Sequence, residues 1–357
     1  MLQNRFGKLA ATALAGSMLM GAAACGGSEE STSAQPSGAA SSAPAASGAK
    51  VGLAYDIGGR GDQSFNDSAA AGLDKAKTEL GLAETKELEA GNGETEAAKE
   101  ERLRLLASGG YNPIIAVGFA YSGPVKKVAA EFPDIKFAIV DDAAATGPNV
   151  SNLLFAEHEG SFLVGAAAAL KSKKNHVGFV GGVRTPLINK FEAGFAAGAK
   201  AVKSDIKIET AYLSEPPEFS GFNDPAKGKT AAQGMFDAGA DVVYHAAGGS
   251  GSGVFEAAKA AKGLAIGVDS DQAKTAAADL QGVIMTSMLK KVDVAVYDFL
   301  KSFAGNSVKS GSTVYDLKSG GVDYSTTGGQ VDDIKTKLDE YKQKIISGEV
   351  TVPDKTS

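Results

Sequence analysis

The chain has 357 residues, with 36 Lys and Arg, 42 Asp and Glu, one Cys, three His and no Trp. A single hydrophobic core stops growing at about 250–300 residues, so this length predicts two lobes. The acidic balance leaves no basic surface for nucleic acid, and one Cys with three His argues against disulfide bonds and a His/Cys metal site. We expect no cofactor.

The first 24 residues have the composition of a secretion signal. Arg5 and Lys8 precede an uncharged, Ala-rich apolar run from Leu9 to Ala24. A membrane-spanning helix needs about 20 apolar residues, and this run is shorter. We therefore expect residues 1–24 to be removed. Without Arg5 and Lys8 the mature chain has 34 basic and 42 acidic residues, a net charge of −8.

Cys25 directly follows three alanines, at the position where a lipoprotein signal peptidase would cut and a lipid would be attached. The alternative is an ordinary Ala-x-Ala cleavage that leaves a free thiol. An unpaired cysteine is unusual in an exported chain, which favours the lipid. Residues 25–49 are rich in Ser, Ala, Gly and Pro, so we predict a disordered tether that anchors the protein on the outer face of the cell membrane.

From Lys50 onward, short β-rich runs alternate with longer Ala-rich runs, which is typical of parallel βαβ units. The pattern predicts strands at residues 51–56, 85–89, 113–118, 137–141, 177–181, 206–212, 241–246 and 264–269, an extended segment at 150–157, and helices at 94–107, 125–131, 187–202, 226–238, 254–262 and 292–303.

Four strand-helix units precede residue 157 and four follow it. The sequence therefore predicts an α/β protein with two doubly wound, three-layer lobes joined by a hinge. We expect a second crossover near 283–287, a hairpin-like segment at 314–324 and an amphipathic helix at 331–346. The expected division places residues 50–157 and about 284–308 in lobe 1, and residues 158–283 and about 309–350 in lobe 2.

The loop after the first strand is the first candidate for a ligand site, because ligands of open α/β sheets bind at the carboxyl ends of the strands. It runs from Asp56 to Asp67 and holds three glycines, which permit a tight turn. Phe65 suits stacking on a planar ring, and Asn66 offers a donor and an acceptor to a heterocycle. Alternatively, Phe65 fills the core and Asn66 or Asp67 caps the next helix.

Carboxylates follow two later strands. Asp141 and Asp142 end one strand, and Asp269 and Asp271 lie at the end of another. Carboxylates at strand ends accept hydrogen bonds from sugar hydroxyls. A pair of them could instead be the general acid and base of a glycosidase-like site, so both possibilities stay open at this point.

A glycine-rich run at 248–253 precedes another predicted helix. It lacks the lysine of a phosphate-binding loop and the spacing of a dinucleotide-binding loop. We therefore predict that the backbone of this run lies close to an uncharged ligand. His245, at the end of the preceding strand, is expected to be a hydrogen-bonded wall residue. Lys290 and Lys291 either reach back toward the cleft or lie on the surface at a helix start.

Six segments in this order resemble the basic membrane protein family, purine-nucleoside-binding lipoproteins with the type I periplasmic-binding-protein fold. The resemblance spans residues 51–310, and its motifs lie at 56–66, 137–142, 221–229, 247–253, 266–272 and 286–291.

The resemblance implies a cleft in which two phenylalanines sandwich a nucleobase while acids and a lysine hold the ribose. The positions it assigns to the ligand are Phe65 and Phe222 for stacking, Asn66 at the base edge, Asp269 and Lys290 at the ribose, and Asp56, Asp141 and Gly248 as further lining residues. We also expect Ser64, which directly precedes Phe65, to contact the ligand. Because residues 216–220 lengthen the turn before Phe222, Phe219 is an alternative stacking residue.

The function implied is that of a non-enzymatic receptor that delivers a nucleoside to an ABC import permease. A receptor of the same fold for a sugar or an autoinducer is the first alternative. A glycoside or nucleoside hydrolase, with Asp141 and Asp269 as acid and base, is the second.

Overall fold

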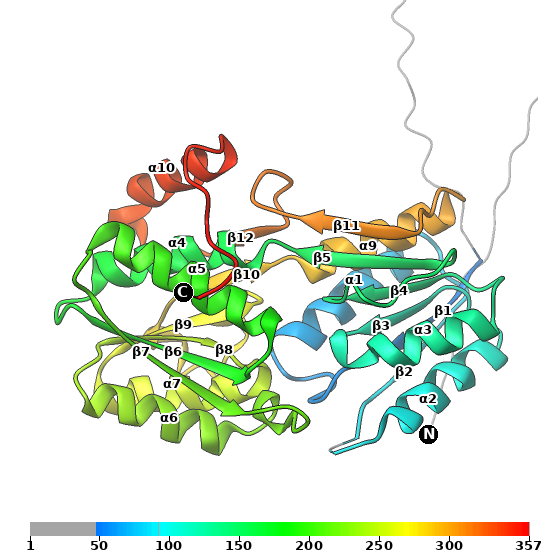
Figure 1. Cartoon of the computed structure of the whole chain (residues 1–357), viewed down its shortest axis with the longest axis horizontal. Helices are drawn as coiled ribbons and strands as arrows, with labels where there is room; N and C mark the ends of the chain where they lie inside the picture. The colour runs from blue at the N-terminus through cyan, green and yellow to red at the C-terminus, as the bar shows by residue number, and fades with distance from the viewer. Residues whose placement is uncertain (1–47, 92, 357) are drawn as a thin grey trace, which may run out of the picture. The chain divides into compact units, whose positions relative to one another are not determined.

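The strands of the chain form two separate sheets. The computed structural model describes residues 48–91 and 93–356, so the expected signal peptide, Cys25 and nearly all of the expected tether lie outside the described residues. Within them, each sheet has six strands, nearly all parallel, and each is covered by helices on both faces (Figure 1). The predicted α/β class with two doubly wound lobes is confirmed.

The first sheet has the strand order β11-β5-β4-β3-β1-β2. Its strands are β1 (Lys50–Ala54), β2 (Glu84–Leu88), β3 (Ile114–Val117), β4 (Phe137–Val140), β5 (Val150–Phe155) and β11 (Gly311–Tyr315), and its helices are α1 (Phe65–Glu79), α2 (Glu96–Ser108), η1 (Phe119–Tyr121), α3 (Ser122–Glu131) and α9 (Val292–Ala304). We call this half lobe 1.

The second sheet has the order β12-β10-β9-β8-β6-β7. Its strands are β6 (His176–Val183), β7 (Lys207–Ser214), β8 (Val242–Ala246), β9 (Leu264–Asp269), β10 (Ile284–Lys290) and β12 (Val322–Tyr324), and its helical elements are α4 (Glu157–Lys171), α5 (Pro186–Val202), η2 (Ser220–Phe222), α6 (Pro225–Asp237), η3 (Gly248–Ser250), α7 (Gly251–Ala261), α8 (Gln272–Thr275), η4 (Gln281–Val283), η5 (Asp332–Ile334) and α10 (Lys335–Ile346). We call this half lobe 2.

Alternation along the strands divides the buried side chains between the two faces of each sheet. In β3, Ile115 and Val117 face α1 and α9, whereas Ile114 and Ala116 face α2 and α3. All four side chains are buried, as expected for a parallel strand covered on both faces. This burial explains why such strands are recognisable as uninterrupted apolar runs.

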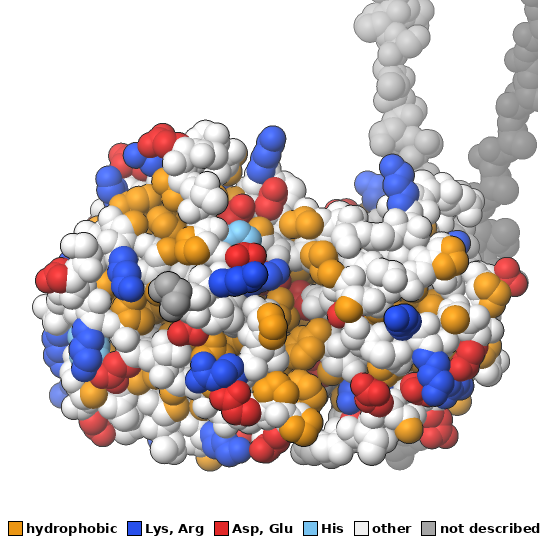
Figure 2. Space-filling view, viewed as in Figure 1, with side chains coloured by type: hydrophobic (Ala, Val, Ile, Leu, Met, Phe, Trp, Pro, Cys, Tyr) orange, Lys and Arg blue, Asp and Glu red, His pale blue; other side chains and the backbone are white. Residues whose placement is uncertain are grey.

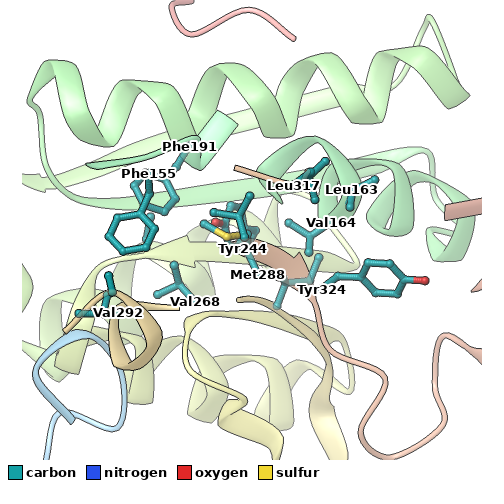
Figure 3. Packing of buried hydrophobic residues seen from close by; sticks show 14 of the residues in the cluster. Phe155, Leu163, Val164, Phe191, Tyr244, Val268, Met288, Val292, Leu317 and Tyr324 are labelled. Carbon is teal, nitrogen blue, oxygen red and sulfur yellow. The ribbon is translucent and has the colours of Figure 1, made fainter. Parts of the chain in front are cut away.

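One hydrophobic cluster extends through both lobes. It includes Phe155 of β5, Phe191 of α5, Val268 of β9 and Val292 of α9, which Figure 3 shows in a single packed region. At about 25 cal/mol per Å² of buried apolar surface, each such side chain stabilises the fold by roughly 1.5–3 kcal/mol. The lobes therefore share part of one core.

Two predicted segments belong to the other lobe. Residues 284–290 form β10, which pairs with β9 and β12 in lobe 2, so the expected start of the lobe 1 segment at 284 is wrong. Residues 311–315 form β11, which pairs with β5 in lobe 1. The expected hairpin at 314–324 is also wrong, because β11 and β12 lie in different sheets. Apolar strands look alike in sequence, and only pairing assigns them to a sheet.

The chain exchanges one helix between the lobes in each direction. After β5 it crosses to lobe 2, where α4 packs closely on α5. After β10 it crosses to lobe 1, where α9 packs on α1. The second crossover therefore lies at Lys291, immediately after β10, and not within 283–287.

Three glycines permit the close packing of α4 on α5. A Cβ atom at Gly165, Gly194 or Gly198 would lie within 2.1 Å of a backbone carbonyl oxygen of the facing helix. Two heavy atoms that are not bonded to each other cannot lie so close, so these positions require glycine in this packing.

We expect Gly198→Ala to lower the free energy of unfolding by about 1–3 kcal/mol, because a methyl group would push α5 away from the carbonyl oxygen of Phe162, 1.9 Å from the Cβ position. The control is Gly234→Ala in α6, where no atom lies within 4 Å of the added Cβ and helix propensity predicts stabilisation of up to about 1 kcal/mol. Urea denaturation of both variants measures the difference. Equal effects would show that the α4–α5 packing does not need glycine.

Candidate functional site

A cavity lies where the carboxyl ends of both sheets meet. Hydrophobic side chains gather along the junction of the two lobes in Figure 2. The cavity is lined by Asp56, Ile57, Asp62, Phe65, Asn66, Phe119, Asp141, Leu187, Ile188, Phe191, Phe222, Ala246, Gly248, Val268, Asp269 and Lys290.

The loop after β1 is held by the carboxylate of Asp62. Its Oδ1 accepts hydrogen bonds from the backbone N–H groups of Ser64 (2.9 Å) and Asp67 (3.1 Å), and its Oδ2 accepts from the N–H of Asn66 (2.9 Å). These N–H groups lie at the first turn of α1, where no carbonyl of the helix can reach them. Asp62, rather than Asn66 or Asp67, therefore caps α1.

Capping by Asp62 leaves the hydroxyl of Ser64 free for another contact. Ser64 is fully buried and does not line the cavity; its Oγ donates to Asp269 Oδ2 at 2.7 Å. Ser270 Oγ in turn donates to the carbonyl of Ser64 at 2.9 Å. Ser64 thus joins lobe 1 to lobe 2 and orients a cavity carboxylate.

Asn66 lines the cavity and also fixes the loop around it. Its Oδ1 accepts from the N–H of Asp56 at 3.0 Å, and its Nδ2 donates to Ile57 O (3.3 Å) and to Asp62 Oδ2 (3.1 Å). The side chain of Asp56 faces the cavity, and burial raises its pKa to about 6, although the N–H of Ile57 donates to the carboxylate. Burial penalises the charged form of a carboxyl group.

Lys290 forms the polar centre of the site. Its side chain is 3 % exposed, and its Nζ donates to Asp141 Oδ2 at 2.5 Å and lies 3.5 Å from Asp269 Oδ1. Burial alone would lower the pKa of Lys290, but Asp141, Asp269 and Glu157 outweigh it and raise the pKa. The lysine is therefore charged and links one carboxylate from each lobe. Of the two expected alternatives, a surface position is wrong for Lys290.

Asp141 and Asp269 occupy matching positions with the same unusual backbone. Each follows or ends a central strand, and their φ angles are +63° and +62°, in the left-handed region that costs a residue other than glycine about 1 kcal/mol or more. Within the described residues, Asp141 Oδ1 and Asp269 Oδ1 accept no hydrogen bond. Carboxylate oxygens that accept no hydrogen bond from the protein are suited to accept one from a ligand hydroxyl group.

Aromatic side chains form the apolar walls. Phe65 and Phe222 come from opposite lobes, and the Phe65 ring centroid lies 4.4 Å from Lys290 Nζ. Phe119 of η1 meets Phe222 edge-on, with centroids 6.5 Å apart. Phe219 lines a neighbouring cavity instead, 5.8 Å from the Phe119 centroid. Of the two candidate stacking residues, Phe222 is the one that shares a cavity with Phe65.

The glycine-rich run after β8 lines the cavity on one side and packs against His245 on the other. Gly248 lines the cavity with φ +54°, whereas a Cβ at Gly251 would overlap the ring of His245. His245 is fully buried, its Nε2 lies 3.0 Å from Gln272 Oε1, and burial lowers its pKa to about 4. It is a neutral hydrogen-bonded residue beneath the glycine run.

Eight of the nine expected ligand residues line this one cavity: Asp56, Phe65, Asn66, Asp141, Phe222, Gly248, Asp269 and Lys290. Residues that sequence reasoning missed include Phe119, Leu187, Ile188 and Phe191. Phe119 directly follows a predicted strand, so the strand-end criterion could have found it. Phe191 lies inside a helix, and no sequence signal separates it from a core residue.

The described residues contain no group of three or more His, Cys, Asp and Glu side chains placed to hold a metal ion. Among the same residues, no helix has the length and apolarity needed to cross a membrane.

Comparison with known proteins identifies relatives over almost the whole described chain. A family model described as "ABC transporter substrate-binding protein PnrA-like" matches residues 49–356. The "CD4+ T-cell-stimulating antigen" of Listeria monocytogenes is 36% identical over 326 residues, which cover 85% of this chain and 88% of the relative. The "ABC transporter nucleoside-binding protein BmpA" of Lactococcus lactis is 34% identical over 320 residues, covering 86% and 89%.

A solved structure of ABC transporter solute-binding proteins from Aeropyrum pernix K1 is 30% identical, with a TM-score of 0.75 over 87% of this chain and 94% of that chain. These matches confirm the family resemblance that the six sequence motifs predicted.

We expect Lys290→Met to lower the free energy of unfolding at pH 7 by about 3–5 kcal/mol, because it leaves two buried carboxylates without a cation. Adding Asp141→Asn should restore part of the loss. Lys291→Met, at the half-buried neighbouring position, is the control. Urea denaturation of the four proteins checks this. Equal stability of Lys290→Met and Lys291→Met would contradict a central role for the ion pair.

Asp56 should make stability depend on pH. Because its pKa is raised to about 6 in the folded state, its favourable contribution is present below about pH 4 and is lost as the pH rises through 6. The free energy of unfolding of Asp56→Asn, relative to that of the wild type, should therefore rise by about 3 kcal/mol between pH 4 and pH 8. Urea denaturation of ligand-free protein across this range measures the gain. A difference that does not change with pH would exclude a buried, perturbed carboxyl group.

Proposed function

The chain belongs to the PnrA-like family of ABC transporter substrate-binding proteins, and on this premise we propose that it captures a purine nucleoside and delivers it to an ABC import permease. The observation that carries the proposal is the division of one cavity into aromatic walls and a charged centre. Phe65 and Phe222 supply the walls, and Lys290 with Asp141 and Asp269 supplies the centre. A nucleoside has the same division between its flat base and its hydroxylated ribose.

The aromatic walls suit the base. Stacking on an aromatic side chain contributes about 1–3 kcal/mol per contact. Two contacts, one on each face, would supply a large share of the roughly 8 kcal/mol of a micromolar affinity. Because the two rings come from different lobes, both contacts form only when the lobes close, which couples binding to hinge motion.

The charged centre suits the ribose. The free oxygens of Asp141 and Asp269 can each accept a hydrogen bond from a hydroxyl group, and the Lys290 ammonium can donate to one. In our proposal Asp56 accepts from the base edge, and Gly248 lets the backbone approach the ligand closely. Asn66 and Ser64 hold Asp56 and Asp269 in place.

The proposal includes lipid attachment at Cys25 on the outer face of the membrane. It rests on the signal-like residues 1–24 and on the position of this cysteine after three alanines. Residues 26–49 would then tether the receptor beside its permease.

The proposal is tested by isothermal titration of the mature domain, unfolded and refolded to remove any ligand that was purified with it. We expect low-micromolar or tighter binding of adenosine, guanosine or inosine and no binding of ribose. Phe65→Ala and Phe222→Ala should each weaken binding about 5- to 150-fold, which corresponds to the loss of one stacking contact of about 1–3 kcal/mol.

The matched control is Phe219→Ala, since Phe219 lines a different cavity and should alter adenosine binding less than threefold. Binding of ribose or another sugar alone would replace the nucleoside with the sugar alternative. Conversion of a nucleoside to base and ribose during the titration would favour the hydrolase alternative.

A further inference from the structure

A second cavity opens beside the base end of the first. It shares Asp56 and Ile57 with the nucleoside cavity. Its remaining walls come from both lobes. Lobe 2 supplies the segment Pro217–Ser220, which we call the strap, and lobe 1 supplies Ala90, Gly91, Gly93, Glu94, Lys99 and Ala120. We call this cavity the annex.

Hydrogen bonds hold the strap in place as part of the annex wall. The carbonyl of Glu218 accepts from Ser214 Oγ at 2.9 Å, and the carbonyl of Phe219 accepts from the N–H of Phe222 at 3.1 Å. The Phe219 ring contacts Phe119, which lines the nucleoside cavity. Phe119 and Phe219 thus stand at the boundary between the two spaces.

Lys99 places an ammonium group at the wall of the annex. Its side chain is 9 % exposed, and its Nζ lies 3.4 Å from Glu94 Oε1. That same oxygen accepts a shorter hydrogen bond from Arg102 Nη1, at 2.9 Å, and Arg102 Nη2 donates to Glu94 Oε2. Arg102 therefore neutralises Glu94, and the buried ammonium of Lys99 remains a donor at the wall of a cavity.

We propose that the annex receives an exocyclic substituent of the bound base that ends in a hydrogen-bond acceptor, a carbonyl or carboxylate oxygen, held by Lys99. The inference rests on the proposed function, in which the ribose lies at Lys290 and the base edge faces Asp56. A substituent on that edge points past the shared residues into the annex. The receptor then accepts base-modified nucleosides as well as plain ones.

The test is isothermal titration of the refolded mature domain with adenosine, N6-carboxymethyladenosine, N6-carbamoylmethyladenosine and N6-propyladenosine. We expect both acceptor-bearing derivatives to bind at least as tightly as adenosine, and the propyl derivative to bind at least tenfold more weakly than they do. Lys99→Met should weaken binding of the acceptor-bearing derivatives about tenfold and change adenosine binding less than threefold. Lys126→Met, an exposed lysine of the same lobe, is the control.

Ala120→Leu provides a second variant that does not alter any charge. By filling the annex, it should abolish the preference for the derivatives and leave adenosine binding unchanged. If adenosine binds but both acceptor-bearing derivatives bind more weakly than adenosine, or if Lys99→Met affects all four ligands equally, the annex proposal is wrong and the nucleoside proposal stands. If no nucleoside binds, both proposals fail.

Discussion

The buried ammonium of Lys290 must find its counter-charges inside the protein, because an unpaired charge in such a site would cost several kcal/mol. It finds them on the carboxyl ends of two sheets, Asp141 in lobe 1 and Asp269 in lobe 2. Bringing these three groups together fixes how the strand ends face each other. The cavity, its aromatic walls and the contacts of the loop after β1 are all arranged around this triad.

The triad is surrounded by part of the apolar cluster that the two lobes share. The Lys290 ammonium lies 5.5 Å from the ring centroids of both Phe155 and Phe191, which belong to the cluster that runs through both lobes. Rings around a cation exclude water and strengthen its electrostatic attraction to the carboxylates.

The sequence predicted which residues line the cavity better than it predicted the boundaries of the lobes. Parallel strands and their ends are local patterns, so the amino-acid order alone was enough to place Asp141 and Asp269 at the carboxyl ends of strands. Burial of Lys290 depends on contacts with Asp141 and Asp269, which lie far from it along the chain. Capping by Asp62 is local, but the same loop also offers Asn66 and Asp67 as caps, and the loop conformation decides among them. The exchange of β10 and β11 between the expected lobes was missed because strand pairing is not local.

The two sheets have the same strand order, and each lobe receives one helix from the other half of the chain. The two halves are thus built alike, and Asp141 and Asp269 lie at matching strand ends. A perfectly symmetric site would bind an asymmetric ligand in two opposite directions with equal free energy. Lys290 ends β10 where Phe155 ends β5, so these matching positions differ between the lobes and make the two directions of an asymmetric ligand unequal in free energy.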